Sequence, residues 1–198
     1  MSHASEDSGI DRRAFVAGLL QGCPHALVIT GLGSSAYDVF AAGDRDENFY
    51  LWGAMGGAAA VGLGLALAQP QRSVLVITGD GEQLMGLGML ATIGAQQPGN
   101  LSIVVLDNGH FGETGMQRSH TSLGTDLAAI ARGCSFRNVV EIRDMGEVGA
   151  LSRTVNARSG CTLAMVQVRA DELPRVLPPR DGVYVKNRLR AALGFAPF

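Results

Sequence analysis

Residues 73–110 read SVLVITGDGEQLMGLGMLATIGAQQPGNLSIVVLDNGH, and two apolar runs in them, 73–78 and 101–106, flank a helical segment. A near-continuous, β-branched run is typical of a strand that is buried on both faces of a parallel sheet. A strand, a helix and a second parallel strand form a right-handed crossover unit. The stretch therefore predicts one such unit, with a polar, glycine-containing turn after each strand.

The same alternation continues on both sides of this unit. We expect further strands over residues 25–30, 137–142 and 162–168. We expect helices over residues 12–20, 56–68, 83–94, 126–132, 146–157 and 187–193. Repeated strand–helix units predict an α/β fold with a doubly wound parallel sheet flanked by helices. We interpret residues 1–198 as one domain with a core over about 12–170, followed by a linker and a helix over 171–198.

The composition favours a compact, glycine-rich α/β protein, because 46% of the 198 residues are apolar, 17% are charged and 27 are glycine. The formal charge of −2, without a basic block, gives no reason to expect a nucleic acid partner. The N-terminal sequence MSHASEDSGIDRR lacks the apolar run of a signal peptide, and residues 51–69 are too rich in Ala and Gly for a membrane span. Cys23, Cys134 and Cys161 are widely spaced and odd in number, so they indicate neither a disulfide framework nor a metal knuckle. We expect a cytoplasmic protein.

The turns after the first three strands read GLGSSA, GDGEQ and DNGHFGETG. In an open parallel sheet, ligands bind outside the carboxyl ends of the strands. Asp80 and Asn108 supply the hard oxygen ligands that suit Mg²⁺, with phosphate and water completing its octahedron. The adjacent Gly79, Gly81 and Gly109 leave backbone N–H groups open to a phosphate. The second and third turns therefore predict the two halves of a magnesium–diphosphate site.

At these turns the sequence resembles the thiamine diphosphate enzymes, whose signature is GDG followed about two dozen residues later by NN or a close variant. Here the 25 residues 82–106 separate Gly79-Asp80-Gly81 from Asp107-Asn108. The resemblance implies that Mg²⁺ is held by Asp80, Asn108 and the backbone carbonyl of His110. Asp107 stands where the family usually has Asn, and Glu82 stands where many relatives have Ser or Ala beside the diphosphate.

Upstream, WGAMGG is similar to a segment of the decarboxylase branch of this family. The resemblance implies that the Gly53 carbonyl binds the aminopyrimidine ring and that Met55 supports the bent, V-shaped cofactor. It also places Thr30 and Gly31 beside the diphosphate. The resulting prediction for the cofactor-binding set is Thr30, Gly31, Gly53, Met55, Gly79, Asp80, Gly81, Glu82, Asn108, Phe111 and Gly112.

Full-length members of this family have two similar domains, and their pyrimidine-binding domain donates an activating Glu to the cofactor. The chain resembles only the diphosphate-binding (PP) domain, most closely the beta subunit of sulfopyruvate decarboxylase or the C-terminal half of phosphonopyruvate decarboxylase. This implies a pyrimidine-binding α subunit that supplies the Glu, in a hetero-oligomer with two or more copies of each chain. The implied reaction converts 3-sulfopyruvate to sulfoacetaldehyde and CO₂, and phosphonopyruvate or another 2-oxo acid is the alternative substrate.

The segment HFGETGMQRSH follows the third turn directly and is the candidate substrate loop. We expect Glu113, His110 and His120 to act in catalysis, because histidine is a common proton carrier and Glu113 is a polar group near the expected reaction centre. Thr114 and Arg118 are candidate substrate contacts, and Arg118 would offer positive charge to a sulfonate or phosphonate. On this hypothesis, Arg118→Ala raises the KM for an anionic 2-oxo acid more than the KM for pyruvate. The alternative is a solvated loop that packs against a partner.

Other interpretations stay open at this point. Asp80 is also a candidate helix cap, and Met55 a candidate core residue. The turn GLGSSA matches the dinucleotide fingerprint G-x-G-x-x-A, with Asp44 or Asp46 as the ribose-binding acid, which would make the chain a Rossmann-like NAD-binding protein. A third alternative is a non-catalytic subunit that binds a partner but no cofactor.

Overall fold

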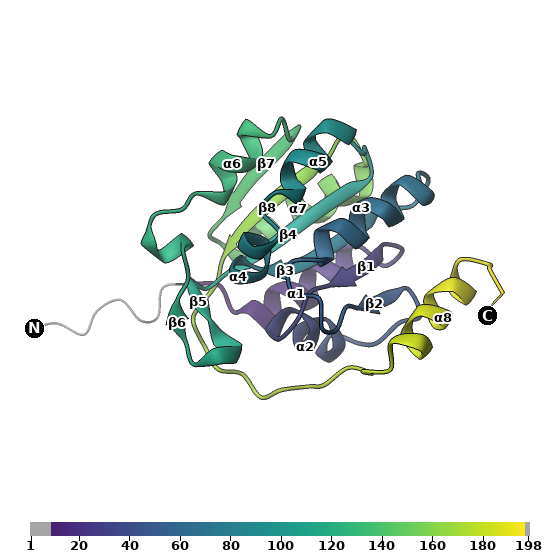
Figure 1. Cartoon of the computed structure of the whole chain (residues 1–198), viewed down its shortest axis with the longest axis horizontal. Coiled ribbons are helices and arrows are strands. Elements are labelled where there is room, and N and C mark those ends of the chain that lie inside the picture. The colour runs from purple at the N-terminus through teal and green to yellow at the C-terminus, as the bar shows by residue number, and fades with distance from the viewer. Residues whose placement is uncertain (1–8, 197–198) are drawn as a thin grey trace, which may run out of the picture.

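The structure, a computed structural model, describes residues 9–196 and is built around a parallel six-stranded sheet in the order β2-β1-β3-β4-β8-β7 (Figure 1). The central pair β3 and β4 runs in register from Val74↔Leu101 to Gly79↔Leu106. The strands of the sheet are β1 (Leu27–Thr30), β2 (Asn48–Tyr50), β3 (Val74–Gly79), β4 (Leu101–Asp107), β7 (Asn138–Ile142) and β8 (Thr162–Gln167).

Helices cover both faces of this sheet. One apolar core joins β-strand side chains to α1 (Arg12–Gly22), α2 (Ser34–Ala41) and α7 (Val148–Ala157). The other core joins the alternate strand side chains to α3 (Ala58–Ala68), α5 (Met89–Gln96) and α6 (Leu127–Gly133). In β1, for example, Val28 belongs to the first core, while Leu27 and Ile29 belong to the second. This three-layer arrangement confirms the predicted doubly wound α/β fold.

The remaining elements lie mainly at the carboxyl edge of the sheet and at the end of the chain. The antiparallel pair β5 and β6 follows β4, and α8 lies beside β2 (Figure 1). Their bounds are α4 (Asp80–Met85), β5 (His110–Phe111), η1 (Gly112–Thr114), β6 (Gln117–Arg118), η2 (Thr121–Leu123), η3 (Met145–Glu147) and α8 (Gly182–Ala192).

The predicted strands agree with β1, β3, β4, β7 and β8 to within two residues at either end, but α2, β2 and the β5–β6 pair were not predicted. The helix expected over 83–94 is instead two helices, because the chain turns at residues 86–88 between α4 and α5. Close backbone approach explains why residue 86 in this turn is glycine: a Cβ on Gly86 would clash with the carbonyl oxygen of Gly56. The turn thus seats the loop before α3 against the end of α4.

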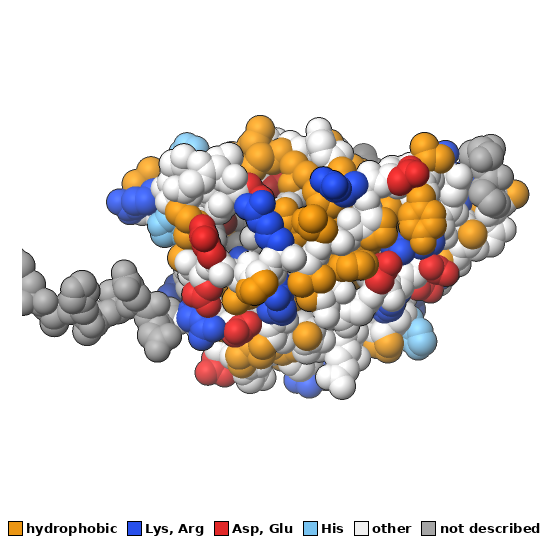
Figure 2. All heavy atoms as spheres, turned by 90° about the horizontal axis from the view of Figure 1, so that it is seen from below, with side chains coloured by type: hydrophobic (Ala, Val, Ile, Leu, Met, Phe, Trp, Pro, Cys, Tyr) orange, Lys and Arg blue, Asp and Glu red, His pale blue; other side chains and the backbone are white. Residues whose placement is uncertain are grey.

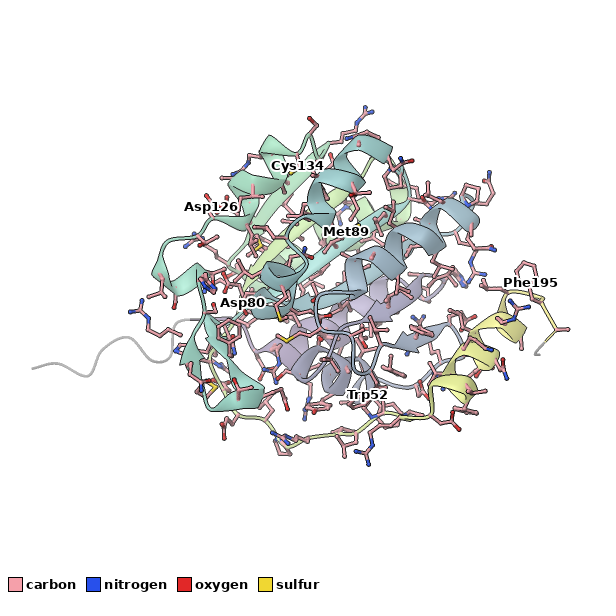
Figure 3. The ribbon with its side chains drawn as sticks, in the orientation of Figure 1. Trp52, Asp80, Met89, Asp126, Cys134 and Phe195 are labelled. Carbon is pink, nitrogen blue, oxygen red and sulfur yellow. The ribbon has the colours of Figure 1, made fainter. Side chains whose placement is uncertain are left out.

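The C-terminal segment runs along the surface from β8 to α8 (Figure 1). The Trp52 indole Nε1 donates a hydrogen bond to the carbonyl of Pro179 at 3.0 Å, and Figure 3 shows Trp52 beside this segment. The helix α8 begins at Gly182, earlier than expected, because Asp181 accepts hydrogen bonds from the backbone N–H groups of Val183 and Tyr184. The face seen from below mixes apolar and charged side chains (Figure 2).

Two expectations about special chemistry can be compared with the structure. The three cysteines are all free thiols, as expected from their spacing. Among residues 9–196, no helix combines the length and the apolar character needed to cross a bilayer. The Ala-rich run expected to be no membrane span contains the 11-residue helix α3.

Candidate functional site

A cavity of about 390 Å³ opens at the carboxyl edge of the sheet. From β1 the chain passes to β2 on one side, whereas β3 pairs with β1 on the other side. Ligands of doubly wound sheets bind at such a reversal of strand order. The cavity is lined there by residues from the turns after β1, β3 and β4, together with the start of α1 and the loop before α3.

Most of the residues predicted from the sequence line this cavity. They are Met55, Gly79, Asp80, Gly81, Glu82, Asn108, His110, Phe111, Gly112, Glu113 and Thr114. Five others do not appear in its lining: Thr30, Gly31, Gly53, Arg118 and His120. Sequence reasoning did not single out the remaining lining residues, which are Arg12, Leu32, Gly33, Ser34, Ser35, Tyr37, Trp52 and Leu106. Several of these belong to the unpredicted helix α2 and the turn before it.

Asp80 is buried, with 2% of its surface exposed (Figure 3). Its Oδ2 accepts hydrogen bonds from the hydroxyl of Thr121, at 3.2 Å, and from that of Ser119. Burial raises the pKa of the Asp80 carboxyl, the Ser119 hydrogen bond opposes this, and the nearby Asp107 charge raises it further. The interpretation of Asp80 as a helix cap is wrong, because α4 is preceded by Gly79 and has no side-chain cap bond.

The turn after β4 is shaped by its own side chains. Asp107 Oδ1 accepts from the Gly109 N–H and Asn108 Oδ1 accepts from the His110 N–H, both at 3.0 Å. Gly109 has a φ of +69°, a conformation that favours glycine. Asp107 also accepts from the Thr121 hydroxyl at 2.8 Å, so Thr121 links this turn to Asp80. Sequence reasoning gave Ser119 and Thr121 no role, although Ser119 lies within the candidate substrate loop, because neither follows a strand that the sequence predicted.

Glu82 acts as a structural link between three segments at the switch point. Its carboxylate accepts from the Leu32 N–H at 3.0 Å, the Gly56 N–H at 3.3 Å and the Thr78 hydroxyl at 3.0 Å. Burial raises the pKa of Glu82, and these hydrogen bonds lower it. A Cβ on Gly31 would clash with this carboxylate. Glu82 therefore ties the turn after β1 to the loop before α3, and its charge is directed at backbone donors.

Glu113, in η1, and Met55, in the loop before α3, both line the cavity. The Tyr37 hydroxyl donates to Glu113 Oε2 at 3.4 Å, and the Arg175 guanidinium lies 3.4 Å from the same oxygen. Burial raises the pKa of Tyr37, with the charge of Glu113 adding to it. Met55 is 42% exposed and lines the cavity, so its interpretation as a core residue is wrong.

The residues outside the lining have other surroundings. His120 packs edge-on against Phe111 with ring centroids 6.2 Å apart. Arg118 is exposed and bonds to Ser122, with Nε 3.2 Å from the hydroxyl oxygen. Thr30 is fully buried, and its hydroxyl has no hydrogen-bond partner within residues 9–196. Gly53 has a φ of +75°, a conformation that favours glycine.

Neither of the two acidic residues considered for the dinucleotide interpretation, Asp44 and Asp46, lines the cavity. Asp44 accepts from the Tyr50 hydroxyl at 2.8 Å and binds the Arg188 guanidinium of α8 at 2.5 and 3.1 Å. Asp44 is thus engaged at the β2 edge of the sheet and does not line the cavity.

Comparison with known proteins identifies the family that the sequences of the turns after β3 and β4 resemble. Residues 35–166 match the family described as "Thiamine pyrophosphate enzyme, C-terminal TPP binding domain". The chain is 41% identical over 177 residues to phosphonopyruvate decarboxylase of Streptomyces viridochromogenes, covering 87% of this chain and 43% of that one. It is 45% identical over 118 residues to sulfopyruvate decarboxylase subunit beta of Methanothermobacter thermautotrophicus, covering 60% and 62%. The chain thus spans less than two thirds of either relative.

The fold has solved counterparts as well. The thiamine diphosphate-dependent 4-hydroxybenzoylformate decarboxylase of Rhodococcus jostii superposes with a TM-score of 0.70 at 19% identity, covering 87% of this chain and 35% of that one. At this identity the likeness shows the fold alone.

Proposed function

Since the chain belongs to the thiamine pyrophosphate enzymes, through their C-terminal TPP-binding domain, we propose that it is the diphosphate- and Mg²⁺-binding subunit of a heteromeric 2-oxo acid decarboxylase. The observation that carries this proposal is that Asp80 and Asn108, from neighbouring strands, line one cavity at the switch point of the sheet. The relatives named as decarboxylases support the reaction class.

The donor set fits a divalent cation. Asp80 is a buried carboxylate whose side-chain partners within residues 9–196 are two hydroxyls, and Asp107 adds negative charge nearby. A buried anion without a cationic partner is unfavourable, and a bound metal ion would compensate it. Carboxylate, amide and backbone carbonyl oxygens are the ligands that Mg²⁺ accepts. We infer that Asp80, Asn108 and the His110 carbonyl would hold Mg²⁺.

The rest of the cavity fits the organic part of the cofactor. The predicted diphosphate contacts Gly79, Gly81 and Gly112 and the apolar side chains of Met55 and Phe111 line it together. Bound thiamine diphosphate would supply the nucleophilic carbon and the electron sink that loss of CO₂ from a 2-oxo acid requires. The roles of Thr30, Gly31, Gly53 and Glu82 as cofactor contacts stay predictions.

The chain's own polar groups would position the substrate and move protons. Glu113 is held by the Tyr37 hydroxyl and by Arg175, so its carboxylate has a fixed place in the cavity wall. His110 and Thr114 line the same cavity. We infer that Glu113 and His110 carry protons to and from the reacting groups and that Thr114 contacts the substrate. His120, whose ring packs edge-on against the cavity-lining Phe111, would be a further proton carrier on this proposal.

The partner and the substrate follow from the relatives. Because several relatives are named subunit beta, we infer a pyrimidine-binding α subunit, which would supply the activating Glu in a hetero-oligomer with two or more copies of each chain. The preferred substrate on this proposal is 3-sulfopyruvate, with phosphonopyruvate as the alternative. We expect the complex to act in the cytoplasm.

The test is calorimetric titration of thiamine diphosphate and Mg²⁺ into the purified chain, alone and with its α subunit. Binding is expected to need Mg²⁺, to be lost in Asp80→Ala and to tighten with the partner. Asp126→Asn is the matched control, because Asp126 caps α6 away from the cavity and Asn can replace it as a cap. If wild type binds no cofactor in either setting, or if Asp80→Ala binds as well as wild type, the proposal fails.

A further inference from the structure

Arg12, at the start of α1, is the one Lys or Arg among the described residues that line the cavity. Only 7% of its surface is exposed, although arginine is rarely buried unless it is paired. Neither the motifs nor their spacing singled it out, because it precedes the first strand. A buried guanidinium in the wall of a ligand cavity requires an explanation of what balances its charge.

Asp38 provides part of that balance. This carboxylate of α2 is fully buried, and it binds the Nε of Arg12 and, at 3.1 Å, the Nε of Arg13. Two guanidinium groups therefore share one carboxylate, so the cluster of Arg12, Arg13 and Asp38 carries a net positive charge. Because Asp38 uses only the Nε of Arg12, both Nη groups remain for another partner. The structure gives them none within residues 9–196.

An oxyanion is the ligand that such a group fits. Guanidinium N–H groups bind carboxylate, sulfonate or phosphonate oxygens in pairs, and they do so most strongly where water is excluded. The hydroxyl-bearing residues Ser34 and Tyr37 line the same cavity and, together with Arg12, a smaller adjoining cavity of about 100 Å³. Glu113 also lines both spaces, so the cation lies in the same part of the wall as the candidate proton carrier.

Arg118, the cation expected from the sequence, has a different environment. It is exposed on β6, bonds to Ser122 and is not in the cavity lining. Of these two arginines, only Arg12 is both buried and directed to the cavity by a fixed carboxylate.

We propose that Arg12 is the specificity-determining residue, whose guanidinium, oriented by Asp38, binds the sulfonate or phosphonate group of the 2-oxo acid. This inference rests on the proposed function and names the residue that would select its anionic substrates. Arg13 shares Asp38 but does not line the cavity, and its Nη2 donates to the Pro174 carbonyl at 2.8 Å.

The first test is steady-state kinetics of the reconstituted complex with 3-sulfopyruvate and with pyruvate. Arg12→Gln is expected to raise the KM for 3-sulfopyruvate roughly 10- to 100-fold, the usual loss for a charge-assisted hydrogen bond, and to change the KM for pyruvate by less than about threefold. Arg12→Lys should recover part of the loss, because it keeps the charge without the planar fork. Arg13→Gln is the matched control for loss of a bond to Asp38. Its ratio of the KM for 3-sulfopyruvate to the KM for pyruvate should equal that of wild type.

The second test measures binding without turnover. Trp52 is the only tryptophan and lines the cavity, so its fluorescence reports directly on occupancy. Titration of the full chain with sulfoacetate should give a saturable change in Trp52 fluorescence in wild type and in Arg13→Gln. In Arg12→Gln, the Kd for sulfoacetate should be at least tenfold higher. Propionate, which lacks the sulfonate, should bind wild type and Arg12→Gln with equal Kd.

The outcomes separate this inference from the proposed function. If wild type binds sulfoacetate through Arg12 but the complex decarboxylates no 2-oxo acid, the proposed function fails and the anion site stands. If the complex is active and Arg12→Gln keeps the wild-type preference, or if Arg118→Gln alone loses it, the assignment to Arg12 is overturned. A loss of thiamine diphosphate affinity equal to the loss of sulfoacetate affinity would assign the cation to the cofactor and also overturn it. A wild-type chain with no saturable response to sulfoacetate refutes the site.

Discussion

Replacing Gly86 by Ala tests how the turn between α4 and α5 positions the loop before α3, which carries Gly56 and Met55. The backbone at Gly86 has φ −93° and ψ 24°, which alanine can adopt. An added Cβ would nevertheless clash with the Gly56 carbonyl oxygen and lie 3.1 Å from its carbonyl carbon. The cost therefore comes from the contact and not from backbone strain.

Gly88→Ala is the matched control. Gly88 has φ −61° and ψ −21°, and a Cβ there would meet no atom within 4 Å. Both substitutions reduce the entropy of the unfolded chain, which stabilises by about 0.4–1 kcal/mol, so this gain cancels in the comparison. The difference between the two variants is the cost of overpacking, about 1–3 kcal/mol. For a chain of this size that is a difference in Tm of about 2–4 °C per kcal/mol.

The assay is thermal and urea unfolding of both variants, followed by titration with thiamine diphosphate and Mg²⁺. Gly88→Ala should be at least as stable as wild type and bind the cofactor equally well. Gly86→Ala should be less stable and bind more weakly, because relief of the clash moves Gly56 and with it Met55 in the cavity wall. Equal stability and equal affinity of the two variants would falsify the argument that this close approach positions the loop.

Three further changes test other contacts. Without added Mg²⁺, the free energy of unfolding should fall as pH rises above the ordinary pKa values of 3.8 for Asp80 and 4.5 for Glu82, because burial raises both folded-state pKa values and the native state then binds more protons than the unfolded state. In urea unfolding from pH 4.5 to 7, Glu82→Gln should reduce this dependence of the unfolding free energy on pH. A dependence equal to that of wild type would contradict the argument. Arg188→Ala should lower the free energy of unfolding by roughly 1.5–3 kcal/mol and raise the rate of amide hydrogen exchange selectively in α8, since it removes two hydrogen bonds to Asp44. An unchanged exchange rate in α8 would show that other contacts hold the helix. Ser119→Ala should weaken Mg²⁺-dependent binding less than Asp80→Ala, because it removes only one hydroxyl from the carboxylate, and an equal loss in calorimetry would give Ser119 a direct role.

The fold was predictable because the strands β1, β3 and β4 and most of β8 are buried on both faces and therefore read as continuous apolar runs. The unpredicted β2 has only three residues, too few for a pattern, and it is held by pairing with β1. The helix α2 follows a turn in which Gly33 has a φ of +70°, and no side-chain cap marks its start. Its position depends on tertiary contacts such as the buried Asp38 with its two arginines, which no local pattern reveals.

The site was predictable to the extent that it consists of strand ends. Asp80 and Asn108 follow adjacent strands, so parallel pairing alone brings them to one edge. Arg12, Ser119 and Thr121 reach the site from a helix start and from the segment after β6, where the path of the chain is set by packing. Such residues become visible only once the chain is folded.

The three carboxylates in the cavity wall are chemically distinct because their partners differ. Glu82 is bound by backbone N–H groups and a hydroxyl, and Glu113 by a phenol and an arginine. Asp80 has only hydroxyls, with a second carboxylate nearby, so it is the one whose charge most favours a metal ion. Arg12 has the opposite deficit, because it is a cation whose two Nη groups do not bind Asp38. On the proposed function, the cavity would therefore hold a cation at Asp80 and an anion at Arg12, as an enzyme would require if it joined a magnesium–diphosphate cofactor to an anionic 2-oxo acid.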